Sequence, residues 1–121
     1  MKKIMFYLLL VVTVFTILLS GCANKSTTLQ FRNYSFENSN EAFKPSVTLQ
    51  ENSNFIFICS LLSSYLAIGS YTIENDNLTL KTEDGEYYYV FEIKGETLIF
   101  NAEKSSDLPS FTVVPNGAIF K

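Results

Sequence analysis

The stretch GSYTIENDNLTLKTEDGEYYYVFEIKGETLIFNA, residues 69–102, decides the fold, because apolar and polar residues alternate along most of it. A period of two is typical of strands that have one buried face. Polar turns interrupt the alternation at residues 74–77, 83–86 and 94–96, and Asp84-Gly85 in the second turn is a strong hairpin signal. The stretch therefore predicts an antiparallel meander of strands joined by short loops.

Eight apolar side chains of this meander are predicted to share one buried face: Ile73, Leu78, Leu80, Tyr89, Phe91, Ile93, Leu98 and Phe100. Further strands are predicted on both sides of the meander, over residues 29–36, 46–50, 55–59, 111–114 and 117–120. Residues 29–121 then form a single all-β domain built around the meander. The many large Phe and Tyr side chains predict a filled core and disfavour a roomy cavity.

Residues 55–73 contain no charged residue, and the run is nearly as long as the roughly 20 residues that a membrane-spanning helix needs. Four serines, Gly69 and two tyrosines dilute its hydrophobicity, however, and the period of two appears at both of its ends. We therefore interpret it as two strands joined by a neutral turn at residues 60–64, in the middle of the β-domain.

The N-terminus carries a different pattern. Two lysines precede a long apolar run, which is the layout of a helical secretion signal. Leu19-Ser20-Gly21-Cys22 then resembles the lipobox of bacterial lipoproteins. This resemblance implies a diacylglyceryl thioether on Cys22, cleavage between Gly21 and Cys22, and removal of residues 1–21 as a signal peptide. A plain membrane anchor is the alternative interpretation.

Under the lipobox interpretation, residues 22–28 are the lipidated N-terminus and a small polar tether. Several acyl chains, palmitate among them, would hold the protein firmly on the extracytoplasmic face of the cell membrane. Loss of Lys2 and Lys3 from nine basic residues leaves seven against twelve acidic residues, a net charge of −5. This acidic balance argues against nucleic-acid binding and against electrostatic adhesion to anionic lipid.

The chain has no histidine, which excludes His-based zinc sites, Ser-His-Asp triads and Cys-His dyads. Ser60, Ser63 and Ser64 are clustered hydroxyls without a recognisable base, so they are interpreted as a turn whose hydroxyls bond the backbone. We therefore expect neither an enzyme nor a cofactor nor a metal site.

Two other clusters have both a functional and a structural interpretation. Cys59 lies in an apolar strand with no positive charge near it in sequence, which favours a buried thiol over a redox role. Acidic residues near two turns could offer oxygen ligands to a hard cation such as calcium, but their spacing is not that of an EF-hand, and solvated turns are the favoured interpretation: Glu74, Asp76, Glu83, Asp84 and Glu86.

Tyrosines are the candidate binding residues. In Tyr87-Tyr88-Tyr89 the strand alternation sets Tyr88 on the opposite face from its two neighbours, so at least one ring faces away from the core. Exposed tyrosine is a good contact for a protein or a glycan. Tyr65, Tyr87 and Tyr88 are therefore the candidate binding surface, and ordinary strand chemistry is the alternative, since tyrosine favours half-buried sheets.

Short strings spread over residues 45–121 look like the core pattern of small lipocalin-like (calycin-type) β-domains: Gly69-Ser70-Tyr71, Leu78-Thr79-Leu80, Tyr89-Val90-Phe91 and Leu98-Ile99-Phe100. Together with Leu62-Ser63-Ser64-Tyr65 and Gly117-Ala118-Ile119-Phe120, they are similar to uncharacterised domains of Gram-positive bacteria. Those domains occur as lone lipoproteins and appended to membrane metallopeptidases of the β-lactam sensor–transducer type. The resemblance implies that the antiparallel meander forms a small lipocalin-like barrel or half-barrel, and it implies no catalytic residues.

The motifs of the catalytic partners are missing, since the chain has neither His-Glu-x-x-His nor Ser-x-x-Lys. The expected function is therefore that of a cell-surface lipoprotein with a binding or accessory role, modulating an envelope or membrane partner. The alternative is a lipocalin-like binder of a small apolar molecule.

The lipobox makes a direct prediction. Cys22→Ala removes the sulfur that would carry the diacylglyceryl group, so metabolic labelling with a fatty-acid analogue should be lost. Gel fluorescence of the labelled protein measures this loss. Retained labelling in the variant would rule out the lipid anchor.

Overall fold

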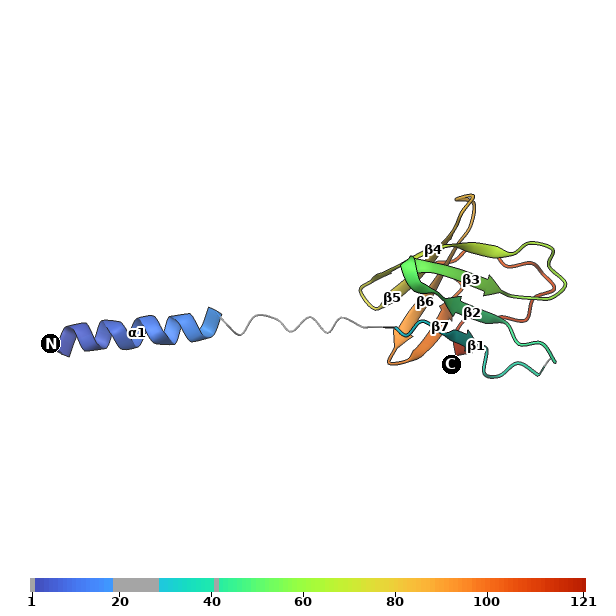
Figure 1. The fold of residues 1–121 in the computed structure, drawn as a ribbon. Helices are drawn as coiled ribbons and strands as arrows, with labels where there is room; N and C mark the ends of the chain where they lie inside the picture. The colour runs from blue at the N-terminus through green and yellow to red at the C-terminus, as the bar shows by residue number, and fades with distance from the viewer. Residues whose placement is uncertain (1, 19–28, 41) are drawn as a thin grey trace.

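The structure, a computed structural model, describes residues 2–18, 29–40 and 42–121 (Figure 1). An N-terminal helix, α1, spans Lys2–Leu18. Within the described ranges, no helix is both long enough and apolar enough to cross a membrane. The lipobox cysteine, the cleavage position and the tether lie outside the described residues, so the signal peptide stays a prediction.

The β-domain consists of strands that follow one another in chain order: β1 Asn33–Ser35, β2 Ser46–Leu49, β3 Asn54–Ile58, β4 Ala67–Glu74, β5 Asn77–Thr82, β6 Tyr88–Lys94, β7 Thr97–Asn101 and β8 Ile119–Phe120. A 3₁₀ turn, η1 at Glu51–Ser53, joins β2 to β3. Each strand pairs antiparallel with the next, so the sheet order equals the sequence order (Figure 1). The predicted antiparallel meander is confirmed.

The first and last strands also meet, which nearly closes the sheet. Ser35 and Lys121 exchange two backbone N–H···O bonds of 2.9 Å, and the N–H of Glu37 donates to the carbonyl of Ile119 at 2.8 Å. The Lys121 ammonium adds an exposed ion pair to Glu37 at 3.1 Å. The result is a nearly closed, barrel-like sheet of eight strands, which fits the predicted lipocalin-like all-β fold.

Aromatic rings fill the interior of the barrel. The Phe120 ring lies 5.7 Å from Phe36, 5.4 Å from Phe91 and 6.5 Å from Phe57, measured between ring centroids. All four side chains are buried. The Phe36 contact is stacked and the other two are edge to face, and such aromatic contacts add to the stabilisation that comes from burying the ring surface. The predicted filled core is therefore found.

Seven of the eight side chains predicted for the buried face are buried, and Ile73 is the exception, with 40% of its surface exposed. Ile73 does pair with Leu78 of β5. On its other side, however, β3 begins at Asn54, which pairs with Ser70, so the last four residues of β4 run beyond β3. The side chain of Ile73 therefore has cover on one flank only.

Two of the predicted strands differ from the structure. Residues 111–114 are not a strand, because the N–H of Thr112 donates to the carbonyl of Pro109 at 2.9 Å and makes a turn. The edge of β7 is already taken by β8, which leaves no partner for them. The first strand covers only three of the predicted residues 29–36. The uncharged run 55–73 is confirmed as β3, β4 and their connection.

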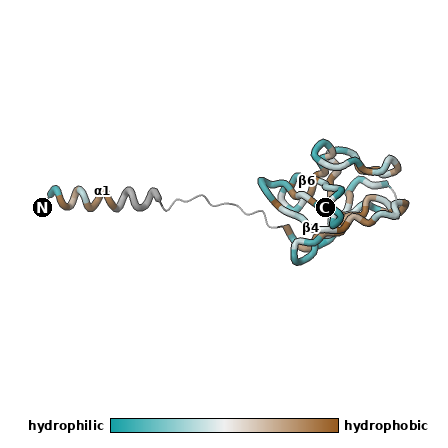
Figure 2. Tube along the Cα trace, turned by 90° about the horizontal axis from the view of Figure 1, so that it is seen from above, coloured by the Kyte–Doolittle hydropathy of each residue, from teal (hydrophilic) through white to brown (hydrophobic). Residues whose placement is uncertain are grey.

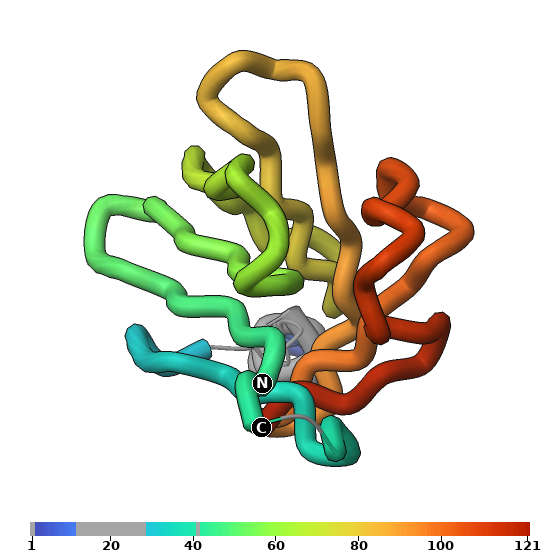
Figure 3. Tube along the Cα trace, turned by 90° about the vertical axis from the view of Figure 1, so that its right-hand side faces the viewer, coloured from blue at the N-terminus to red at the C-terminus, as the bar shows by residue number. Residues whose placement is uncertain are grey.

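The two ends of the barrel are built differently. The tight β4–β5 and β6–β7 turns and η1 lie at the end where the chain enters the domain. Asn75 and Asp76 have φ values of 50° and 60°, as a type I′ hairpin turn requires. The longer connections lie at the opposite end, which we call the mouth, and Figure 3 looks onto it. They are residues 36–45, 59–66, 83–87 and 102–118.

Gly69 lets β4 and β5 approach each other closely beside the mouth. A Cβ at this position would collide with the carbonyl oxygen of Lys81 and come within 2.9 Å of the Cα of Thr82. Both of these atoms belong to the backbone and cannot rotate away. A glycine inside a strand often marks such a close approach or bend.

Gly69→Ala should therefore destabilise the domain by about 1–3 kcal/mol, the usual range for inserting atoms into a packed site. Urea unfolding followed by tyrosine near-ultraviolet circular dichroism measures the free energy. The matched control is Ser70→Ala at the exposed next position, which should change stability by less than about 0.5 kcal/mol. Equal stability of the two variants would contradict the close approach.

Candidate functional site

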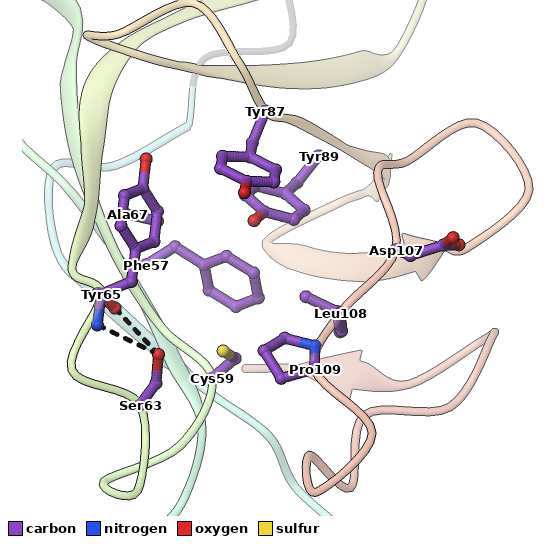
Figure 4. A pocket seen from close by; sticks show the side chains of 10 residues that line it. All are labelled: Phe57, Cys59, Ser63, Tyr65, Ala67, Tyr87, Tyr89, Asp107, Leu108 and Pro109. Carbon is purple, nitrogen blue, oxygen red and sulfur yellow. Dashed lines mark hydrogen bonds between the residues drawn. The ribbon is translucent and has the colours of Figure 1, made fainter.

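A cavity of about 260 Å³ opens between the loops of the mouth (Figure 4). Its walls come from the end of β3, the β3–β4 loop, the start of β4, the β5–β6 connection, the start of β6 and the β7–β8 loop. The residues that line it are Phe57, Cys59, Ser63, Tyr65, Ala67, Tyr87, Tyr89, Asp107, Leu108 and Pro109. We call this cavity the mouth pocket.

The floor of the mouth pocket is the top of the aromatic core. Phe57 and Tyr89 are 2% and 5% exposed, and their rings meet edge to face with centroids 5.0 Å apart. Below them, Phe91 contacts Phe57 with a centroid distance of 5.9 Å. The pocket is therefore a shallow aromatic cup that ends on a filled core.

Two of the predicted tyrosines form one wall. The rings of Tyr65 and Tyr87 lie 5.3 Å apart with an angle of 60° between their planes. The hydroxyl of Tyr65 donates to Oδ2 of Asp84 at 2.9 Å, which ties the β3–β4 loop to the β5–β6 turn. The Ser63 hydroxyl accepts the N–H of Tyr65 and donates to its carbonyl, both at 3.2 Å. The wall is thus held by hydrogen bonds from both loops.

Asp84 is the centre of that hydrogen-bonding group. Its Oδ1 accepts the hydroxyl of Thr82 at 2.6 Å and the N–H of Glu86 at 3.0 Å. The Thr82 hydroxyl, then the Glu86 N–H and the Tyr65 hydroxyl, lower the pKa of Asp84 below its ordinary value. Ionised Asp84 therefore fixes the β5–β6 turn and one wall of the pocket.

The opposite wall belongs to the β7–β8 loop, through Leu108 and Pro109. This loop is held along the edge of β6, past the point where the pairing with β7 ends. The N–H of Val90 donates to the Ser105 hydroxyl at 2.7 Å, and the Tyr88 backbone exchanges bonds with Ser106 at 2.8 and 3.0 Å.

Cys59 lies on the pocket wall with its sulfur toward the cavity (Figure 4). Burial raises the pKa of this thiol above its ordinary value, so the thiol is protonated at neutral pH. It is a free cysteine and is only partly buried. The thiol was predicted to be buried, whereas it is only partly buried, because it lies beside a pocket that was not predicted.

The tyrosine candidates divide in the structure. Tyr65 and Tyr87 come together on the mouth pocket, whereas Tyr88 does not line it and is 53% exposed on the other face of β6. Sequence reasoning missed Phe57, Tyr89 and the β7–β8 loop as parts of the site. Alternation does place Tyr87 and Tyr89 on the same side, and this was the only sequence signal for Tyr89.

The serine and acidic clusters behave as structural features. The hydroxyl of Ser60 accepts the N–H of Leu62 at 3.1 Å, and Ser63 bonds the backbone of Tyr65, so the predicted serine turn is confirmed for these two serines. The acidic residues of the two turns lie at opposite ends of β5, so they do not form one cation site. Within residues 2–18, 29–40 and 42–121, no cluster of three or more metal-ligating side chains occurs.

No protein-family model, curated protein or solved structure matches this chain significantly. The function must therefore be argued from the site itself.

The lowered pKa of Asp84 predicts a pH dependence of stability. Ionised Asp84 adds stability above the ordinary aspartate pKa of about 3.9, and this contribution disappears as the pH falls through the lowered folded-state pKa. The difference in unfolding free energy between the natural protein and Asp84→Ala should therefore shrink below about pH 4. Urea unfolding from pH 6 to pH 3 measures it.

Glu86→Ala is the control, because it removes a charge from the same turn and keeps the backbone N–H that Asp84 accepts. Its stability difference should change little over this pH range. A difference for Asp84→Ala that stays constant down to pH 3 would contradict the assigned hydrogen bonds.

Proposed function

We propose that the protein is a lipid-anchored binding protein of the cell surface, and that the mouth pocket takes a small, mostly apolar molecule. The observation that carries the proposal is an aromatic cup of about 260 Å³ at the open end of an otherwise filled barrel. Ligand sites are typically concave and apolar, with a few polar groups, and barrel mouths are common places for them. The modest volume suits a ligand of one or two rings.

The position of the pocket agrees with an anchor at Cys22. The described β-domain begins at Leu29, at the end of tight turns, and the mouth opens at the other end. Residues 22–28, even fully extended, would reach no more than about 25 Å. Such an arrangement would keep the domain near the membrane with its pocket directed away from it.

An accessory role toward a protein partner is the second candidate. Large apolar side chains are exposed around the mouth: Leu61 at 70%, Leu62 at 79%, Leu66 at 52%, Phe111 at 47% and Val113 at 57%. Hydrophobic segments reach the right-hand end of the domain, opposite to where the chain enters (Figure 2). Exposed apolar patches often mark interaction surfaces, and this rim would suit an envelope or membrane protein.

Neighbouring tyrosines provide the test of the ligand proposal. Tyr87→Ala removes one wall of the pocket, so binding of 2-acetylnaphthalene should weaken about tenfold, as expected for the loss of one aromatic contact together with its buried area. Equilibrium dialysis with the full-length chain in lipid nanodiscs measures binding, and empty nanodiscs correct for partition of the probe into lipid.

Tyr88→Ala is the matched control, since it removes the exposed ring of the adjacent residue and should leave binding unchanged. Leu62→Ser, which alters the rim but not the pocket lining, should also leave it unchanged if the ligand enters the pocket. Equal weakening by Tyr87→Ala and Tyr88→Ala, or no binding at all, would refute the ligand proposal and leave the protein-partner role.

A further inference from the structure

We propose that the Tyr89 hydroxyl selects the ligand by donating a hydrogen bond to an acceptor oxygen at the ligand's inner end. The pocket would then prefer an uncharged molecule that has an apolar ring system and a carbonyl or similar oxygen. This inference rests on the proposed binding function and deepens it, because it names the chemical class of the ligand.

The first observation is that the Tyr89 hydroxyl faces the pocket without a hydrogen bond to another described residue. Tyr89 is 5% exposed, and its hydroxyl lies on the mouth pocket (Figure 4). It makes no hydrogen bond to another described residue, although in the described part of the chain every fully buried side-chain oxygen and nitrogen has a partner. The hydroxyl is therefore accessible only from the cavity, and a molecule in the cavity is what would satisfy it.

A polar group left in this position points to a ligand. Interior tyrosine hydroxyls usually find a partner, and this one instead faces the pocket without a hydrogen bond to another described residue. Phenylalanine would pack equally well against Phe57 and would offer no polar group to the pocket. Burial, followed by the proximity of Cys59, raises the pKa of Tyr89 to about 12, so the hydroxyl is protonated at neutral pH and available as a donor.

The other hydroxyls of the pocket are placed differently. The hydroxyl of Tyr65 is already bonded to Asp84, and that of Ser63 is bonded to the Tyr65 backbone. The Tyr87 side chain is 36% exposed at the rim, where it has access to solvent. Tyr89 is therefore the hydroxyl at the floor, where an apolar ligand loses its water.

The charge around the pocket decides against an anion. None of its lining residues is Lys or Arg, and the thiol of Cys59 is neutral at physiological pH. The acidic residues beside the pocket are Asp107, which lines it, and Asp84, which accepts the Tyr65 hydroxyl. Asp84 is engaged in hydrogen bonds, and Asp107 points away from the rings (Figure 4). A carboxylate ligand would thus be desolvated without a cation, which is costly, whereas a neutral carbonyl meets the Tyr89 donor.

Three probes of one shape test this inference. The full-length chain in nanodiscs is dialysed against 2-acetylnaphthalene, which has an acceptor oxygen, 2-ethylnaphthalene, which lacks it, and 2-naphthoate, which is an anion. The ketone should bind about fivefold more tightly than the hydrocarbon, as one net hydrogen bond would give. Naphthoate should bind most weakly.

Tyr89→Phe keeps the ring and removes the donor. This variant should bind the ketone only as tightly as the hydrocarbon, and its affinity for the hydrocarbon should be unchanged. Tyr88→Phe, which removes the exposed hydroxyl of the adjacent residue, should change neither affinity. Three outcomes would overturn the role of Tyr89 but keep the ligand site. They are equal binding of the ketone and the hydrocarbon to the natural protein, tightest binding of naphthoate, and a preference for the ketone that survives in Tyr89→Phe. Failure of all three probes to bind overturns the proposed function itself.

Discussion

The pairing of the first strand with the last is the contact on which the rest of this structure depends. Two backbone hydrogen bonds between Ser35 and Lys121 bring together segments that are far apart in the chain. They set Phe120 in the middle of the barrel, against Phe36 and Phe91. Without this pairing of the first and last strands, both edges of the sheet would be open to pairing with other chains, and the Phe120 ring would be missing from the core.

Closure also explains where the pocket lies. A barrel of this size has room for side chains, and here the rings of Phe57, Phe91 and Phe120 occupy that room. The mouth pocket lies above these rings, where long loops surround the mouth. The close approach of β4 and β5 at Gly69 brings the β3–β4 loop near the β5–β6 turn, so Tyr65 can reach Asp84. The pocket is thus a product of loops on a rigid, filled scaffold.

Local sequence patterns predicted the strands of the meander, but they did not predict the exposure of Ile73 or the lack of a strand at residues 111–114. The alternation through Leu78, Leu80 and Tyr89 corresponds to buried positions, because each step of two returns to the same face of a sheet. Ile73 obeys the same alternation and is still exposed, since burial depends on the length of the neighbouring strand β3, which the pattern of β4 does not contain. Residues 111–114 have strand-like composition, but no free sheet edge remains to pair with them.

The sequence by itself determined the strand period, the hairpin turns, the filled aromatic core and the candidacy of Tyr65 and Tyr87, because these follow from residue types and from spacing within a few residues. The tertiary structure alone decided that these two rings meet, that Tyr88 is left outside, and that the Tyr89 hydroxyl on the pocket floor has no hydrogen bond to another described residue. These features arise where separate loops and strands converge, and side-chain contacts between such segments depend on the register and closure of the whole sheet rather than on any local pattern.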